Sequence, residues 1–190
     1  MAMNQPDLQN LARMVRRVED RQQLAELLSR YGMAVDDRDF DTVGKLFAVD
    51  GVFRGVKGRQ AVVDFYRERL AKYTASSHYA YTWHFDFDSD DQARGAVNGH
   101  AELCIAGKTI RIALRYLDRY VRTSYGWVFQ ERDIRFRYVL PFDEVAGGLA
   151  DPMRVRWPGA EPQLADLPEQ LQTYIDSRAA PESTVAAGRK

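Results

Sequence analysis

The stretch HYAYTWHFDF, residues 78–87, indicates the fold class, because an aromatic residue occupies every second position from Tyr79 to Phe87. A period of two is typical of a β-strand with one apolar face. Turn residues separate three further alternating stretches, which span residues 93–106, 109–122 and 127–140. These stretches predict a meander of long antiparallel strands.

Helical spacing precedes the strands. One face of a predicted helix carries apolar side chains at Leu24, Leu27, Leu28, Tyr31 and Val35. Two further helices are predicted over residues 41–48 and 58–72. Asp39 or Asp41 is expected to cap the first of these, and the turn Asp50-Gly51 to end it. Helices followed by a meander predict an α+β fold, with helices packed on one face of a curved antiparallel sheet.

The C-terminal part differs in composition. From Pro141 onward the chain holds six of its seven prolines, so we expect an irregular arm. The sequence therefore predicts a domain over residues 1–140 and an extension over residues 141–190. A short helix is expected near residues 167–176, and the last ten residues, 181–190, are expected to be disordered.

Charge and cysteine content limit the function classes. The chain has 27 basic and 27 acidic side chains, which gives no electrostatic reason to expect a nucleic-acid or membrane partner. Cys104 is the single cysteine, so no internal disulfide can form. The chain shows neither a secretory leader nor a long apolar run, so we expect a cytoplasmic protein.

Three histidines are candidates for acid–base chemistry near neutral pH: His78, His84 and His100. His78 and His84 have the same parity, so a regular strand would place both on its less apolar face. A β-bulge could redirect one of them. The alternation itself does not choose between the two, nor does it exclude that both are surface residues.

Arg132 and Asp36 are the other candidates. Arg132 has the parity of the apolar residues Val128, Ile134, Phe136 and Tyr138. A guanidinium among apolar groups must be paired, so Arg132 predicts either an internal salt bridge or a pocket residue. Asp36 lies at the edge of the apolar face of the first helix, where it could point inward or serve as a capping residue.

Other kinds of site lack a motif. The sequence has no HxH or CxxC spacing for a metal, no glycine-rich phosphate loop or dinucleotide fingerprint, and no serine-nucleophile elbow. We therefore expect no metal and no organic cofactor.

The chain carries a set of motifs at residues 27–41, Leu46-Phe47, Asp50-Gly51, residues 58–65, and the strand from His78-Tyr79 to Phe87. Together these motifs resemble the SnoaL-like family of the nuclear-transport-factor-2-like (NTF2-like) superfamily. The resemblance covers about residues 10–140. It implies a cone-shaped α+β barrel of the NTF2-like or cystatin-like type, in which helices and sheet surround one pocket.

By position, the resemblance implies an Asp–His catalytic dyad at Asp36 and His78. It also implies pocket residues at Tyr31, Arg132 and His100. The implied activity is a cofactor-independent lyase, a dehydratase acting on a small hydrophobic and cyclic substrate. The alternatives are an isomerase or polyketide-cyclase-type enzyme with the same dyad, or a non-catalytic binding module. The resemblance also implies a homo-oligomer, with a trimer favoured over a dimer.

Overall fold

The computed structural model describes residues 5–179, so the predicted disorder of residues 181–190 lies outside the described part. The helices are α1 (Gln5–Asp36), α2 (Phe40–Lys45), α3 (Arg59–Leu70), α4 (Val145–Gly148) and α5 (Gln172–Ala179), with a 3₁₀ turn η1 (Phe142–Glu144) before α4. The strands are β1 (Phe47–Phe53), β2 (Val56–Lys57), β3 (Tyr73–Phe87), β4 (Gln92–Ile105), β5 (Lys108–Thr123) and β6 (Gly126–Pro141). Helices precede the long strands, as the sequence predicts.

The strands form one curved sheet in the order β2-β1-β6-β5-β4-β3. Neighbouring strands are antiparallel except β1 and β6, which are parallel, so the sheet is mixed rather than purely antiparallel. No hairpin joins β1 to β6, since β2, α3 and three long strands lie between them in the chain, so this pair is free to be parallel. Asp50 and Gly51, predicted to form a turn, lie within β1, whose register against β6 shifts between Phe47 and Val52.

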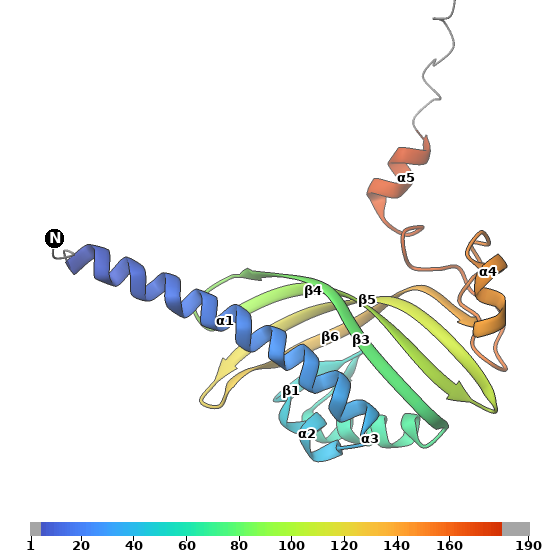
Figure 1. Cartoon of the computed structure of the whole chain (residues 1–190), viewed down its shortest axis with the longest axis horizontal. Coiled ribbons are helices and arrows are strands. Elements are labelled where there is room, and N and C mark those ends of the chain that lie inside the picture. The colour runs from blue at the N-terminus through green and yellow to red at the C-terminus, as the bar shows by residue number, and fades with distance from the viewer. Residues whose placement is uncertain (1–4, 180–190) are drawn as a thin grey trace, which may run out of the picture.

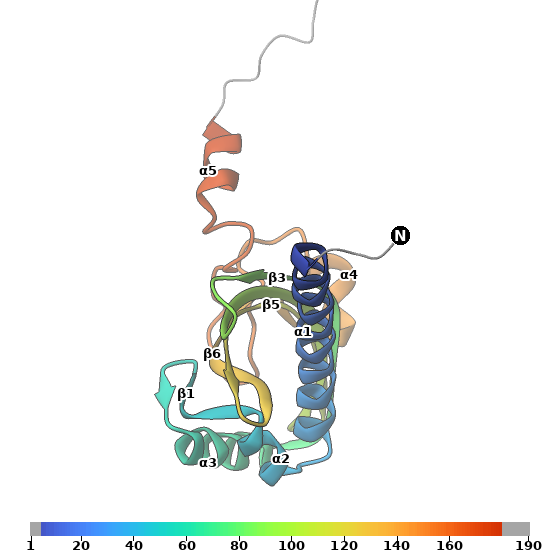
Figure 2. The same cartoon turned by 90° about the vertical axis from the view of Figure 1, so that its left-hand side faces the viewer.

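The core fills the space between α1, α3 and the concave face of the sheet (Figures 1 and 2). Leu24, Leu28 and Val35 of α1 are buried there, as are Val62 and Tyr66 of α3. Asp39 is the N-cap of α2 and accepts a hydrogen bond from the Thr42 backbone N–H at 3.0 Å. None of the helices in the described residues combines the length and the apolar character that crossing a bilayer requires.

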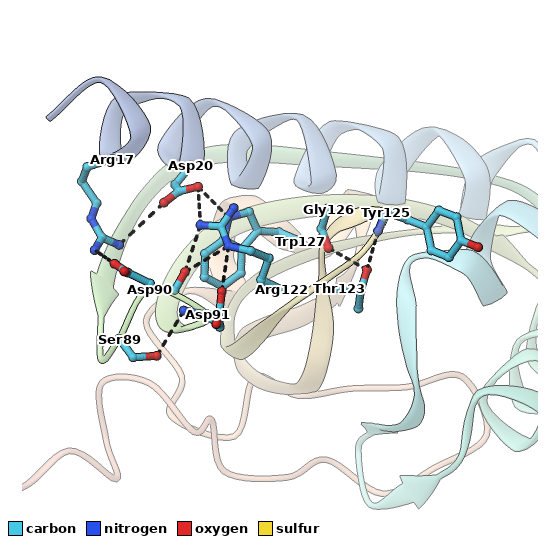
Figure 3. Close-up of polar contacts among 10 residues, drawn as sticks. All are labelled: Arg17, Asp20, Ser89, Asp90, Asp91, Arg122, Thr123, Tyr125, Gly126 and Trp127. Atoms are coloured by element: carbon cyan, nitrogen blue, oxygen red, sulfur yellow. Dashed lines mark hydrogen bonds and ion pairs between the residues drawn. The ribbon is translucent and has the colours of Figure 1, made fainter. Parts of the chain in front are cut away.

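The helix α1 is one unbroken helix of 32 residues, longer than the apolar face at residues 24–35 predicts. Midway along it, the buried Asp20 carboxylate pairs with Arg122 of β5 and accepts a hydrogen bond from the Trp127 indole N–H at 3.1 Å (Figure 3). Arg122 also donates to the Asp90 carbonyl at the β3–β4 turn. This network joins α1 to the end of β5, the start of β6 and the β3–β4 turn.

The segment after β6 folds back on the sheet. Val155 forms bridges with Val139 and with Gln163. Arg154 binds the Glu169 carboxylate through two hydrogen bonds of 2.7 and 2.8 Å and is itself buried. The helix α5 begins at Gln172, inside the predicted span of residues 167–176 but later than its first residue.

Candidate active site

A bulge in β3 determines where His78 points. Ala80 pairs with Gly99 and Thr82 pairs with Asn98, so Tyr81 is an extra residue without a partner on β4. His78 therefore lies opposite Ala101, on the buried face of the sheet. His84 lies opposite Ala96, and its side chain is 67% exposed. The regular alternation would have placed Tyr79 and Tyr81 in the core. The same bulge instead turns both side chains away from the core.

His78 contacts Asp36 through two atoms. The Asp36 Oδ1 atom lies 2.6 Å from His78 Nδ1, and its Oδ2 atom accepts the His78 backbone N–H at 2.7 Å. The backbone bond holds the carboxylate in place independently of the ring. The side chains of His78 and Asp36 are 17% and 21% exposed, so both are partly shielded from water.

The protonation of this pair follows from the contacts. Burial raises the pKa of Asp36, but the hydrogen bonds and charge of His78 outweigh burial and lower that pKa below its ordinary value. An ionised Asp36 requires the proton of neutral His78 to sit on Nδ1. Nε2 then carries the free lone pair, and no residue among 5–179 is hydrogen-bonded to it. This is the tautomer of a general base.

Neighbouring residues hold the pair in position. Gly32, one turn before Asp36, lets α1 approach β3, because a Cβ atom at Gly32 would lie 3.2 Å from the His78 carbonyl oxygen. Arg38, at φ +62°, donates to the Asp36 carbonyl at 2.9 Å and to Ser76 Oγ at 2.6 Å. Arg38 thus ties the end of α1 to the start of β3.

His78 lines two cavities. The larger, about 440 Å³, opens between α1 and the edge strand β3. Its lining is mostly apolar and aromatic, with Leu28, Tyr31, Met33, Trp83, Val97 and Tyr116 beside the polar Asp36, His78 and Arg132. The smaller, about 80 Å³, lies between α1, α3 and the inner face of the sheet and shares Tyr31, His78 and Tyr116 with the first. Trp157 of the C-terminal arm lines it, so the arm contributes to a cavity of its own chain.

Arg132 lies on the inner face with Ile134 and Phe136, as predicted. Val128 and Tyr138 lie on the opposite face, because β6 has extra residues at Gln130 and Arg137 that shift the register.

The Arg132 guanidinium is 1% exposed and binds both oxygens of Asp118, at 2.8 and 2.7 Å. The rings of Tyr31, Tyr116 and Phe129 surround it at 4.0–4.3 Å from their centroids. Arg132 is therefore both an internal salt bridge and a wall of the larger cavity.

Tyr31 lines the larger cavity beside Arg132. Its hydroxyl is 2.5 Å from that of Tyr66, and burial raises its pKa above the ordinary value despite the nearby Arg132 charge. Tyr31 therefore stays protonated at neutral pH and can donate a hydrogen bond.

His100 lies apart from these residues. It pairs with Tyr79 and Ala113 on the outer face of the sheet, and its ring contacts Tyr81 and Tyr138 there. His100 lines neither of the two cavities that His78 lines. The expectation that it belongs to the pocket is not met, because positions of even number on β4 face outward. Nor do three His, Cys, Asp or Glu side chains within residues 5–179 gather as a metal site requires.

Comparison with known families identifies the domain. A sequence model described as the SnoaL-like domain matches residues 16–133, which is more than half of the chain. The chain belongs to the SnoaL-like family. No curated protein matches it in sequence.

Solved structures share the SnoaL-like fold of this chain. Hexachlorocyclohexane dehydrochlorinase LinA-type3 from Novosphingobium barchaimii LL02 is 21% identical, with a TM-score of 0.64, over 69% of this chain and 95% of the other. A scytalone-dehydratase-like protein from Novosphingobium aromaticivorans is 18% identical, with a TM-score of 0.64, over 68% and 91%. An NTF2-like protein with a cystatin-like fold from that species is 27% identical, with a TM-score of 0.56, over 69% and 90%. These similarities establish the cone-shaped fold.

Proposed function

We propose that this SnoaL-like protein is a cofactor-independent lyase that removes water from a small hydrophobic, cyclic substrate. The observation that supports this most directly is the 2.6 Å contact between Asp36 Oδ1 and His78 Nδ1, beside a cavity of about 440 Å³. A histidine with a free Nε2 in an apolar cavity is suited to take a proton from carbon. The names of the dehydratase-like and dehydrochlorinase structures fit an elimination, in which a proton and a leaving group depart from neighbouring carbons.

In the proposed reaction, His78 Nε2 takes a proton from the carbon beside a carbonyl. The electron pair of that C–H bond forms a C=C double bond, and the C–O bond to a hydroxyl on the next carbon breaks. The imidazolium returns its proton to the departing hydroxide, so water leaves and neutral His78 is restored. Asp36 holds Nδ1–H and stabilises the imidazolium while it exists.

We assign to Tyr31 a hydrogen bond to the substrate oxygen that gains negative charge, which is either the carbonyl oxygen or the departing hydroxide. Its hydroxyl stays protonated, and the Arg132 guanidinium lies 4.3 Å from the centroid of its ring. Because Asp118 occupies two nitrogens of Arg132, we assign to Arg132 a positive charge behind Tyr31 and not a primary hydrogen bond to substrate.

The test is product analysis with β-hydroxylated cyclic ketones as probe substrates. We expect loss of one water, and a decrease in rate of about 10²–10⁴-fold in His78→Ala. His84→Ala is the matched control, since that side chain is exposed and far along β3, and it should leave the rate unchanged. A product of unchanged mass that still depends on His78 would favour the isomerase or cyclase. If both the natural protein and His78→Ala bind the probe but neither converts it, the binding module is favoured.

A further inference from the structure

The smaller cavity has a charged end that the proposed reaction does not use. Its walls are apolar along most of their length and include Val35, Leu70, Leu103, Ile112, Leu114 and Phe136. Arg54 and Arg69 also line it. Arg54 is exposed and Arg69 and Trp157 are half-buried, so these residues lie at the end that faces solvent.

The two arginines lie around one pair of aromatic rings. The guanidinium carbon of Arg69 is 5.5 Å from the Trp157 ring centroid, and that of Arg54 is 5.6 Å from the Phe136 centroid. The Phe136 and Trp157 centroids are 5.8 Å apart. Arg69 Nε donates to the Tyr73 hydroxyl at 3.0 Å, which fixes its direction and leaves both terminal nitrogens free.

Neither arginine has an acidic partner among residues 5–179. Arg54 makes no side-chain hydrogen bond or ion pair there, and Arg69 makes only its bond to Tyr73. By contrast, the two buried arginines of the described residues are paired with carboxylates: Arg132 with Asp118 and Arg154 with Glu169. Free guanidinium donors beside aromatic faces at the end of an apolar cavity suit a carboxylate or a similar planar anion.

We propose that Arg54, Arg69 and Trp157 form a subsite for a carboxylate group carried on the hydrophobic substrate. Because His78 lines both cavities, a substrate whose carboxylate lies at this subsite would reach His78 with its reacting carbon, and this part of the assignment rests on the proposed function. Trp157 comes from the C-terminal arm, so the arm supplies part of the substrate specificity. Anion binding itself does not depend on any role of His78.

The test uses benzoate and its neutral analogue benzamide, titrated into the full chain while the tryptophan indole N–H signals are followed by NMR. We expect benzoate to bind about tenfold more tightly than benzamide, since one charged hydrogen-bonded contact is worth about that factor. The double variant Arg54→Gln/Arg69→Gln should bind the two probes equally. Arg135→Gln, an arginine of the outer face paired with Asp133, is the matched control and should keep the preference.

Equal binding of the two probes to the natural protein would overturn the subsite. So would a preference for benzoate that survives in the double variant. Thermal unfolding of each variant shows whether it is folded, and the single variants serve if the double variant is not. Titration of His78→Ala separates the two proposals. Benzoate should bind this variant normally even if the lyase proposal fails.

Discussion

His78 lies directly opposite Ala101 of β4, and both face the helices because Tyr81 is an extra residue in β3. Gly99 of β4 makes room for this bulge. A Cβ atom at Gly99 would lie 2.6 Å from the Tyr79 carbonyl oxygen, closer than side-chain atoms approach backbone. The position of the proposed base therefore depends on a glycine of the neighbouring strand.

Substituting Gly99→Ala should destabilise the protein by about 1–3 kcal/mol, because the added methyl group overpacks the bulge. Urea unfolding measures the change. Deleting Tyr81 should make β3 regular while keeping the pairs Ala80–Gly99 and Thr82–Asn98, so that His78 still faces Ala101. In the Tyr81-deletion variant, Gly99→Ala should reduce the free energy of unfolding by less than it does in the natural protein. Equal costs in the two backgrounds would show that Gly99 does not accommodate the bulge.

Replacing Gly32→Ala should weaken activity more than stability. The helix propensity of alanine favours the change by about 1 kcal/mol, whereas the new Cβ would press on the His78 carbonyl oxygen at 3.2 Å. We expect the Nδ1 proton of His78 to shift in the NMR spectrum, with the turnover rate reduced. Arg30→Ala, at an exposed position of α1 that lines neither cavity, is the control. An unchanged Nδ1 resonance in Gly32→Ala would contradict the proposed close packing.

The Asp36→Asn variant should show a pH-dependent stability difference from the natural protein. Because the folded state has a lowered Asp36 pKa, the ionised carboxylate stabilises it above the unfolded pKa of about 3.9. This contribution is lost as the pH falls through the folded pKa. The difference in unfolding free energy between the two proteins should thus shrink as the pH falls below about 4. A difference that stays constant into acid would exclude the assigned ionisation.

Breaking the Arg132–Asp118 pair should be costly. Asp118→Asn leaves a buried guanidinium without a counter-charge, for which we expect a loss of about 3–5 kcal/mol in urea unfolding. Asp133→Asn, in the exposed pair with Arg135, is the control and should change stability by at most about 1 kcal/mol. Replacing both Arg132 and Asp118 with apolar residues should recover much of the loss. A small effect of Asp118→Asn alone would contradict the burial of the pair.

The order of helices and strands could be predicted because periodicity is a local property. The orientation of side chains along the strands could not, because a single extra residue inverts it, as at Tyr81 in β3 and Gln130 in β6. A glycine inside a strand is a signal of such a bulge, and Gly95 and Gly99 of β4 carry it. Reading that signal would have favoured an irregular β3.

The residues around the candidate site were predictable to different degrees. Arg132 stood out by its parity, and Asp118 shares the inner face of β5 with Tyr116 and Tyr120, so its pairing could have been inferred from the same pattern. Arg38 carried no such signal. Its contacts depend on a left-handed backbone conformation and on the meeting of α1 with β3, which only the folded chain brings together.

The unbroken α1 helix connects Asp36 rigidly to Asp20. Asp20 is held by Arg122 and Trp127, and it lies sixteen residues or roughly 24 Å away along the helix. A tilt of only a few degrees about this point would move the Asp36 carboxylate by more than an ångström, enough to break its contact with His78. The buried face of α1 from Leu24 to Val35 and the contacts of Arg38 oppose such a tilt, so the whole helix, and not the dyad alone, sets the distance between Asp36 and His78.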